Sequence, residues 1–254
     1  MMHRNKLDNY FNELLNVSKF KDYCPNGLQV EGTDNIKKIA FAVSATRDSI
    51  TQAVALGADT LVVHHGLFWH FHGARPITGH IAKRIFPLVQ NNINLFAYHL
   101  PLDAHPEIGN AAVLGNLIGC QQQNPFGNYK GCPTGIEGML SEPISAKELG
   151  LKLNTLLNHD IILASPDEEQ IIESIGIITG GANSDWLLAK QAGLDAYITG
   201  EISEHDWHES QENGIHMFAG GHYATEIFGI LALMQQVQIQ LHLDCVFIDS
   251  NNPA

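Results

Sequence analysis

The chain has 254 residues, 44% of them hydrophobic and 16% charged, and its formal net charge at pH 7 is -13. This composition is typical of a globular protein with a substantial core and excludes disordered and fibrous classes. The acidic balance, without a lysine or arginine cluster, argues against an extended nucleic-acid surface. Apolar runs are far shorter than the roughly 20 residues that cross a bilayer. We therefore expect no membrane span and no signal peptide.

The cysteine content bears on disulfide bonds and cellular location, and the histidine content bears on metal binding. The four cysteines form no C-x-x-C pair and are too sparse for a disulfide scaffold, which predicts a reducing, cytoplasmic location. The 14 histidines equal lysine and arginine together. Imidazole is the commonest protein metal ligand near neutral pH. The positions of the histidines must decide whether they bind metal.

Helix and strand patterns alternate along the first part of the chain. Apolar spacing predicts helices over residues 8–17, 48–56, 81–90 and 110–117, the last closed by Gly119. Strands are predicted over residues 38–44, 59–65 and 93–99. Residues 120–143 break the alternation with four glycines and three prolines. We interpret this stretch as loops or an antiparallel hairpin, and as the best candidate boundary.

The alternation resumes after this Gly/Pro-rich segment. Helices are predicted over residues 146–157, 186–191 and 224–235, and strands over residues 173–179, 195–199, 215–219 and 244–248. The pattern predicts an α/β fold with mostly parallel sheets and flanking helices. The boundary divides the chain into halves at about residues 1–122 and 144–254. A weak internal similarity leaves duplication open, because helix, glycine and strand recur in any α/β protein.

Polar clusters follow the predicted strands at four places. They are His64 with His65, His99 with Asp103, Glu201 with His205, and His222 with Glu226. Open α/β sheets bind ligands at the carboxyl ends of their strands. Because successive strand residues point to opposite faces, two adjacent imidazoles stay neighbours only where a strand ends. These clusters are therefore the candidate functional site.

Local spacing supports three of the clusters as metal ligands. If a helix follows Gly221, His222 and Glu226 are four residues apart on one helical face. The proline after Leu100 is expected to keep the chain extended, so that Asp103 projects from a loop. A histidine-rich set with carboxylates suits Zn, Fe, Mn, Co or Ni better than Mg or Ca. Up to four imidazoles and two carboxylates exceed the needs of one ion and favour a two-metal site.

Ordinary structural roles remain open for each cluster. The histidine pair is also a packing feature of loops, and His99 is placed to cap a strand. Asp103 with His105 is also typical of a turn before Pro106, and an H-x-x-x-E pair occurs on exposed helices. The other histidines lack such context and are interpreted as surface or packing residues: His3, His70, His72, His80, His159, His208, His216 and His242.

Other catalytic signatures are missing from the sequence. It has no G-x-S-x-G elbow, no P-loop and no G-x-G-x-x-G after a strand, which argues against serine hydrolases, nucleotide kinases and dinucleotide oxidoreductases. An aromatic cluster at residues 67–71 follows the histidine pair. Such a cluster is suited to stacking on a planar ring, but it is also typical of a core or a subunit interface.

Five ordered motifs resemble those of the Ngg-interacting-factor-three-like family, also labelled type 2 homologues of GTP cyclohydrolase I. They are residues 25–32 (PNGLQVEG), 63–69 (VHHGLFW), 99–106 (HLPLDAHP) with Gly109 and Asn110, 199–201 (TGE) and 221–226 (GHYATE). The resemblance covers nearly the whole chain. It is to the short form, because residues 120–143 are too few for the inserted domain of longer members. Gly66 stands where many members have proline.

The resemblance implies a fold in which two similar α/β halves form one compact body around a dinuclear metal site. It also implies a homohexameric ring. The implied metal ligands are His64, His65, Asp103, His222 and Glu226. His99 is implied as a sixth ligand or as a partner of one. The implied cofactor is a pair of divalent transition-metal ions, with Zn, Fe, Mn, Co and Ni as candidates.

The resulting hypothesis is a metal-dependent hydrolase acting on a nucleotide or related small molecule. Water activated by the ions would attack an electrophilic carbon or phosphorus, and Glu201 or His99 would shuttle the proton. In a cyclohydrolase, the attack would fall on the imidazole carbon of a purine. The alternative is a non-catalytic, ring-forming adaptor or metal-trafficking protein, because fold does not fix chemistry.

Overall fold

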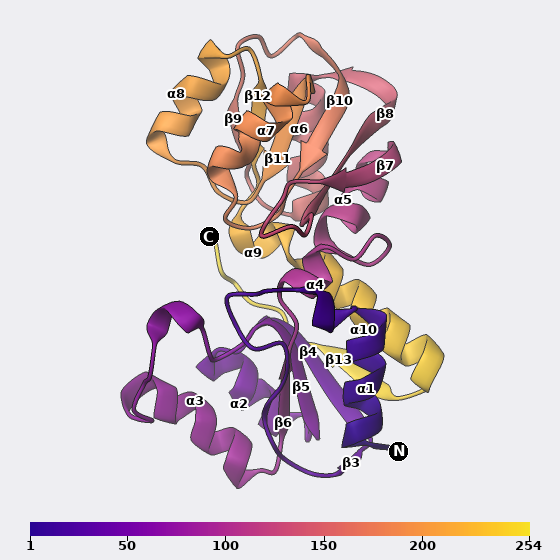
Figure 1. Ribbon diagram of the computed structural model, residues 1–254, viewed down its shortest axis with the longest axis vertical. Helices are drawn as coiled ribbons and strands as arrows, with labels where there is room; N and C mark the ends of the chain where they lie inside the picture. Colours follow the sequence, from indigo (N-terminus) through magenta and orange to yellow (C-terminus); the bar gives the residue numbers. More distant parts are fainter. The chain divides into compact units, whose positions relative to one another are not determined.

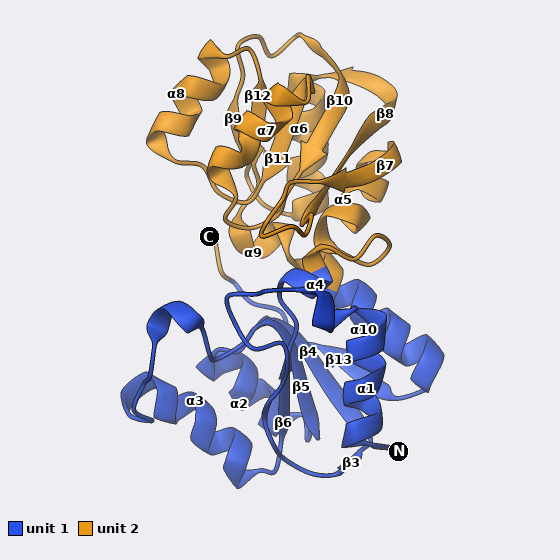
Figure 2. Ribbon diagram, viewed as in Figure 1, with its two compact units in different colours: residues 1–102, 230–251 blue, residues 103–229, 252–254 orange.

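The computed structural model describes residues 1–254, which form two compact units (Figure 2). The first unit comprises residues 1–102 and 230–251, and the second comprises residues 103–229 and 252–254. These boundaries differ from those of the predicted halves, because residues 103–122 belong to the second unit and residues 230–251 return to the first. None of the helices has both the length and the apolar character needed to cross a bilayer.

The first unit is built on a five-stranded sheet. In spatial order its strands are β13 (Asp244–Phe247), β4 (Lys38–Ser44), β5 (Thr60–His65), β6 (Asn94–Ala97) and β2 (Gly27–Val30). The first four are parallel, and β2 pairs antiparallel with β6 at the edge. Two short strands, β1 (Met2–His3) and β3 (Asn35–Ile36), form a separate antiparallel pair. The prediction of a mostly parallel sheet is confirmed here.

Helices cover both faces of this sheet (Figure 1). Ile50 of α2 (Arg47–Ala55) and Ile85 of α3 (Gly79–Gln90) share a buried core with Ala42 and Val63 of the strands. On the opposite face, Phe11 of α1 (Arg4–Leu14) lies against Phe96, with 6.0 Å between ring centroids. Burial on both faces explains why β4 and β5 are continuously apolar rather than alternating.

The second unit has a six-stranded mixed sheet. In spatial order its strands are β7 (Cys120–Phe126), β8 (Gly135–Ser145), β10 (Ile171–Ile177), β11 (Ala196–Thr199), β12 (His216–Ala219) and β9 (Ile162–Ala164). Only β10, β11 and β12 are parallel to one another, and the remaining pairs are antiparallel. The α/β class is confirmed, but parallel pairing is restricted to the centre of this sheet.

Helices also pack on both faces of the second sheet. Leu114 of α5 (Asn110–Ile118) and Leu153 of α6 (Ala146–Leu157) share one core with Ile198. Trp186, the first residue of α7 (Trp186–Gln191), packs with Tyr197 in a second core. Neighbouring residues of β11 thus enter opposite layers, as the pleat of a strand requires.

The segment 120–143 forms a strand pair instead of loops. Residues of β7 pair antiparallel with β8, so the hairpin interpretation is confirmed and the loop interpretation is wrong for most of the segment. A Cβ on Gly135 would overlap the carbonyl oxygen of Ile177, and one on Gly138 would overlap that of Gln121. Glycine here permits close approach of neighbouring strands rather than marking a loop.

Helix α8 (Glu204–Glu212) was absent from the predicted elements. Its sequence, EHDWHESQE, has no apolar stripe, and its buried residues, Asp206 and Ser210, are polar. The predicted helix over residues 224–235 is replaced by α9 (His222–Thr225) and α10 (Ile227–Leu241). The other predicted helices and strands are present within a few residues of their expected bounds.

Candidate metal centre

The first unit brings three imidazoles together at the carboxyl ends of two adjacent parallel strands. His64 and His65 are the last residues of β5, and His99 follows β6. The ring centroids lie 4.5 Å apart for His64 and His65, and 5.1 Å apart for His64 and His99. One ring nitrogen from each lies within 4.8 Å of the others. This spacing allows all three rings to contact one ion.

Each of these rings is oriented through its Nδ1 atom. His64 Nδ1 lies 3.0 Å from the carbonyl oxygen of Tyr98, and His65 Nδ1 lies 3.1 Å from Ser44 Oγ. Because a carbonyl only accepts hydrogen bonds, this contact places a proton on His64 Nδ1, so that Nε2 is the atom that would ligate a metal. Metal-binding histidines are commonly oriented in this way.

His99 is held by a buried carboxylate, Asp22, which the sequence reading did not single out. His99 Nδ1 lies 2.7 Å from Asp22 Oδ1, and the other oxygen accepts from Leu100 N and Asn26 Nδ2, each at 2.9 Å. Burial raises the pKa of Asp22, but the bond and charge of His99 and the bonds from Asn26 and Leu100 outweigh it and lower that pKa. Nothing in the sequence around Asp22 resembles a metal motif.

The second unit brings His222, Glu226 and Glu201 together. His222 begins α9, directly after Gly221 at a φ of 87°. Its Nε2 lies 3.2 Å from Glu226 Oε2, and its Nδ1 lies 2.6 Å from Glu201 Oε1. Burial lowers the pKa of His222, but Glu226 and Glu201 outweigh it and raise that pKa to about 9. The predicted proximity of His222 and Glu226 is therefore present.

The glycine at position 180 allows the backbone to approach Glu226, and Gly181 lies in ordinary contact with Glu201. Gly180 has a φ of 69°, and a Cβ there would overlap Glu226 Oε1. A Cβ on Gly181 would lie 3.4 Å from Glu201 Oε2. Thr225 Oγ1 accepts from Gly180 N at 3.1 Å, which fixes the loop against α9. The sequence does not predict a role for this loop, because Gly180 and Gly181 follow β10 and neither has a titratable side chain that would mark a site.

Asp103 is placed by a short helix rather than by an extended loop. Residues Leu100–Asp103 form α4, so the expectation from the proline is wrong. Proline is compatible with the first turn of a helix. Asp103 is 8% exposed, and its Oδ1 accepts from Asn110 Nδ2 at 2.8 Å. Asn110 in turn accepts from Gly229 N at 2.6 Å, so a buried amide holds the carboxylate.

Two further histidines that follow the predicted strands, His105 and His205, lie outside these clusters. His105 Nδ1 accepts from Glu107 N and Ile108 N, both at 3.2 Å, as expected for a turn. His205 lies on α8 with its Nε2 3.6 Å from Asp206 Oδ1, and its side chain is 60% exposed. Neither residue joins the imidazole cluster or the His222 cluster.

The fold and these side chains define a class, an α/β protein with histidine and carboxylate clusters suited to metal. A family model described as Duf34/NIF3 (NGG1p interacting factor 3) matches residues 2–253. Proteins named GTP cyclohydrolase 1 type 2 homolog from Vibrio cholerae and Escherichia coli K12 are 41% and 40% identical, each over 100% of both chains. The chain belongs to the Duf34/NIF3 family, which confirms the resemblance drawn from the motifs.

Solved structures agree with this assignment. One titled "protein ybgI, unknown function" is 40% identical, with a TM-score of 0.91 and coverage of 100% of both chains. A protein of Thermus thermophilus is 31% identical, with a TM-score of 0.90 and the same coverage. These similarities confirm the fold class.

Proposed function

We propose that this protein is a metal-dependent hydrolase whose dinuclear centre activates water against a nucleotide or related small molecule. The observation that carries the proposal is the cluster of His64, His65 and His99. Three imidazoles converge there, and each is oriented through Nδ1. Histidines that ligate a metal usually donate their other ring N–H to a carboxylate or carbonyl, and this pattern supports a metal as the ligand.

The proposed ligands are those that the family resemblance implies. They are His64, His65, Asp103, His222 and Glu226, with His99 as a sixth ligand or as a partner of one. Imidazole and carboxylate together suit Zn, Fe, Mn, Co or Ni. The two ions, when bound, would lower the pKa of water and polarise the substrate. The name of the relatives, GTP cyclohydrolase 1 type 2 homolog, supports a nucleotide substrate.

The residues expected as proton shuttles, His99 and Glu201, each take part in a carboxylate–histidine pair. Asp22 fixes the ring of His99, and Glu201 fixes the ring of His222. Such partners set the tautomer and raise the basicity of a ligand. The side chain of Glu201 is also 50% exposed, which allows it to exchange a proton with solvent. We propose that Glu201 combines both tasks.

Elemental analysis of protein purified without chelator tests the proposal. The wild type should carry close to two ions per chain, and His64→Ala and His222→Ala, one from each unit, should both lower that content. His205→Ala is the matched control, because His205 is exposed and outside both clusters. Absence of metal after reconstitution with Zn, Fe, Mn, Co and Ni would show that the histidines are structural.

The second candidate is an adaptor or metal-trafficking protein without turnover. The family description names an interacting factor, which favours this candidate. It predicts ions that exchange readily, and no hydrolysis of GTP or other nucleotides by the metal-loaded protein. If the wild type hydrolyses a nucleotide and both His65→Ala and Glu226→Ala abolish this activity, the protein is an enzyme and not an adaptor.

The proposal also includes the homohexameric ring implied by the resemblance and the cytoplasmic location suggested by the cysteines. Sedimentation of the purified chain tests the ring directly. A monomer at micromolar concentration would remove it without affecting the metal centre.

A further inference from the structure

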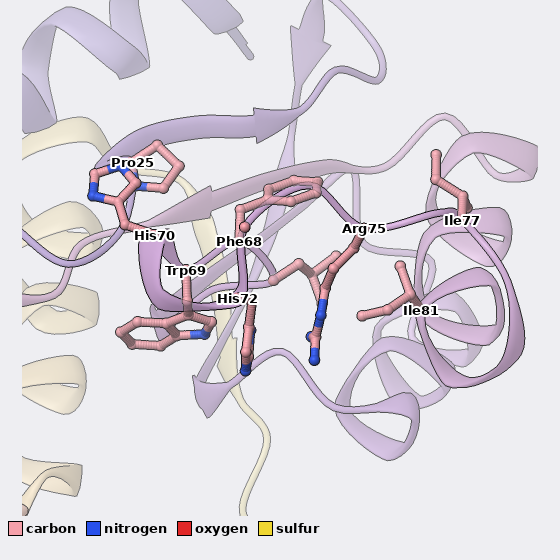
Figure 3. A pocket seen from close by; sticks show the side chains of 10 residues that line it. Pro25, Phe68, Trp69, His70, His72, Arg75, Ile77 and Ile81 are labelled. Carbon is pink, nitrogen blue, oxygen red and sulfur yellow. The ribbon is translucent and has the colours of Figure 1, made fainter.

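The first unit contains a pocket that none of the metal ligands lines. Its volume is about 320 Å³, near the lower end of the range for small-molecule sites. Figure 3 shows the side chains of His72 and Arg75 extending side by side from one loop, with the rings of Phe68 and Trp69 nearby. The remaining lining residues are Pro25, Leu67, His70, Gly73, Ile77 and Ile81.

Trp69 connects this pocket with the imidazole cluster. Its indole lies edge-on to His99, with 5.1 Å between ring centroids, and 5.9 Å from His65. Phe71 stacks on the indole, with 5.6 Å between ring centroids and an interplanar angle of 29°. A planar molecule in the pocket would therefore meet aromatic surface within reach of the proposed metal ligands. Stacking on tryptophan is favourable for any heteroaromatic ring.

Basic side chains also gather along the same loop, with Arg75 and His72 both lining the pocket. The chain has 27 acidic residues, yet none occurs between Asp59 and Asp103. Desolvation lowers the pKa of His72, and the charges of Arg75 and His80 lower it further; of these three residues, His72 and Arg75 line the pocket. Arginine pairs with phosphate through two parallel hydrogen bonds. An anion is the complementary ligand for this local excess of basic groups.

We propose that this pocket binds a heteroaromatic ring carrying a phosphate, with the ring against Trp69 and the phosphate on Arg75 and His72. The inference rests on the proposed function and names the substrate class of the same site. It assigns Trp69 of the aromatic cluster at residues 67–71 to ring stacking, whereas Leu67 of the same cluster belongs to the buried core. It also gives His72 a binding role in place of the surface role expected from the sequence.

Calorimetric titration with guanosine 5′-monophosphate tests the proposal. The wild type should bind this probe, while guanosine and ribose 5-phosphate, which each lack one recognised group, should bind at least roughly tenfold more weakly. Arg75→Ala should weaken binding roughly tenfold to a hundredfold. Arg84→Ala removes the same charge from α3 outside the pocket and should leave the affinity within about twofold.

The metal content of every variant separates this inference from the proposed function. Loss of affinity in Arg75→Ala and in Trp69→Leu, with metal content unchanged, would support it. Unchanged affinity in Arg75→Ala, or equal binding of ribose 5-phosphate, would overturn it. Protein that carries two ions but does not bind the probe at millimolar concentration would also overturn it, while leaving the metal centre intact.

A contact between copies of the chain is the competing use of this pocket. Phe71 is 69% exposed and lies at the rim of the loop. If Trp69→Leu reduced the mass of the assembly and left the affinity for guanosine 5′-monophosphate unchanged, the aromatic surface would belong to a subunit contact. The inference would then be wrong.

Discussion

The orientation of single rings is the most informative feature at the residue scale. His99 and His222 each present Nδ1 to a carboxylate, Asp22 at 2.7 Å and Glu201 at 2.6 Å. The two pairs differ in burial, because the side chain of Asp22 is 2% exposed and that of Glu201 is 50% exposed. Asp22 is therefore expected to be the more rigid support of the two.

Asp22→Asn should weaken metal binding roughly 10-fold to 100-fold, because an amide no longer supplies the carboxylate that orients His99. The measurement is competition with a chromophoric chelator, with circular dichroism to verify the fold. Asp48→Asn, an exposed change on α2, should have no effect. Equal affinity in Asp22→Asn and the wild type would show that His99 needs no such support.

His216 gives a prediction for pH dependence away from the metal clusters. Its side chain is buried, and Nδ1 lies 2.8 Å from Ser165 Oγ. Burial lowers its pKa from the usual 6.5, although Asp195 and Asp167 oppose the shift. Below pH 6.5 the unfolded chain gains a proton that the folded chain does not. The free energy of unfolding should therefore fall as the pH drops through this range.

Urea unfolding of wild type and His216→Gln at pH 7.5 and pH 5.5 measures this effect. The variant should lose less stability between the two pH values than the wild type. His208→Gln, a change on the exposed side of α8, should keep the full wild-type slope. A variant slope equal to that of the wild type would remove His216 as the titrating group.

At the scale of elements, capping side chains at the N-terminus determine where two of the helices begin. Both α2 and α6 start with a capping box, in which Thr46 pairs with Ser49 and Ser145 pairs with Glu148. In each box, two backbone N–H groups at the helix start find side-chain partners. These local signals explain why the predicted bounds of α6, residues 146–157, agree with the structure.

Ser145→Ala should lower the free energy of unfolding by about 1 kcal/mol, because the amide of Glu148 loses its partner. Thr46→Ala, in the first unit, should have a similar cost. Chemical denaturation of both variants measures these changes, with Ser18→Ala, outside the capping boxes, as the control. A loss of less than a few tenths of a kcal/mol would show that solvent replaces the cap.

At the scale of the whole molecule, metal binding should stabilise the fold. A ligand at 100 times its dissociation constant stabilises the native state by about 2.7 kcal/mol. Chelator treatment is therefore expected to lower the melting temperature, and added zinc should restore it. Both steps should change the melting temperature of His64→Ala less than that of the wild type, because this variant is expected to hold less metal. Identical melting of wild type with and without chelator would contradict metal binding in the folded state.

The sequence by itself determined the elements whose signals are local. Apolar periodicity and caps identified β4, α6 and α7 closely, and the strand-end histidines identified the candidate ligands. Polar α8 and the glycines of β8 were misread, because their roles depend on neighbours distant in sequence. A polar helix carries no apolar period, and a glycine in a strand resembles one in a loop until its neighbours are known.

Only the tertiary structure decided which partners orient the candidate ligands. Asp22 lies 77 residues from His99 in sequence. Asn110, which donates to Asp103, accepts a hydrogen bond from the backbone N–H of Gly229, 119 residues away. Contacts of this kind leave no periodic trace, because each arises from the packing of separate elements. Local propensities specify helices and strands, whereas the geometry of a site depends on how those elements pack.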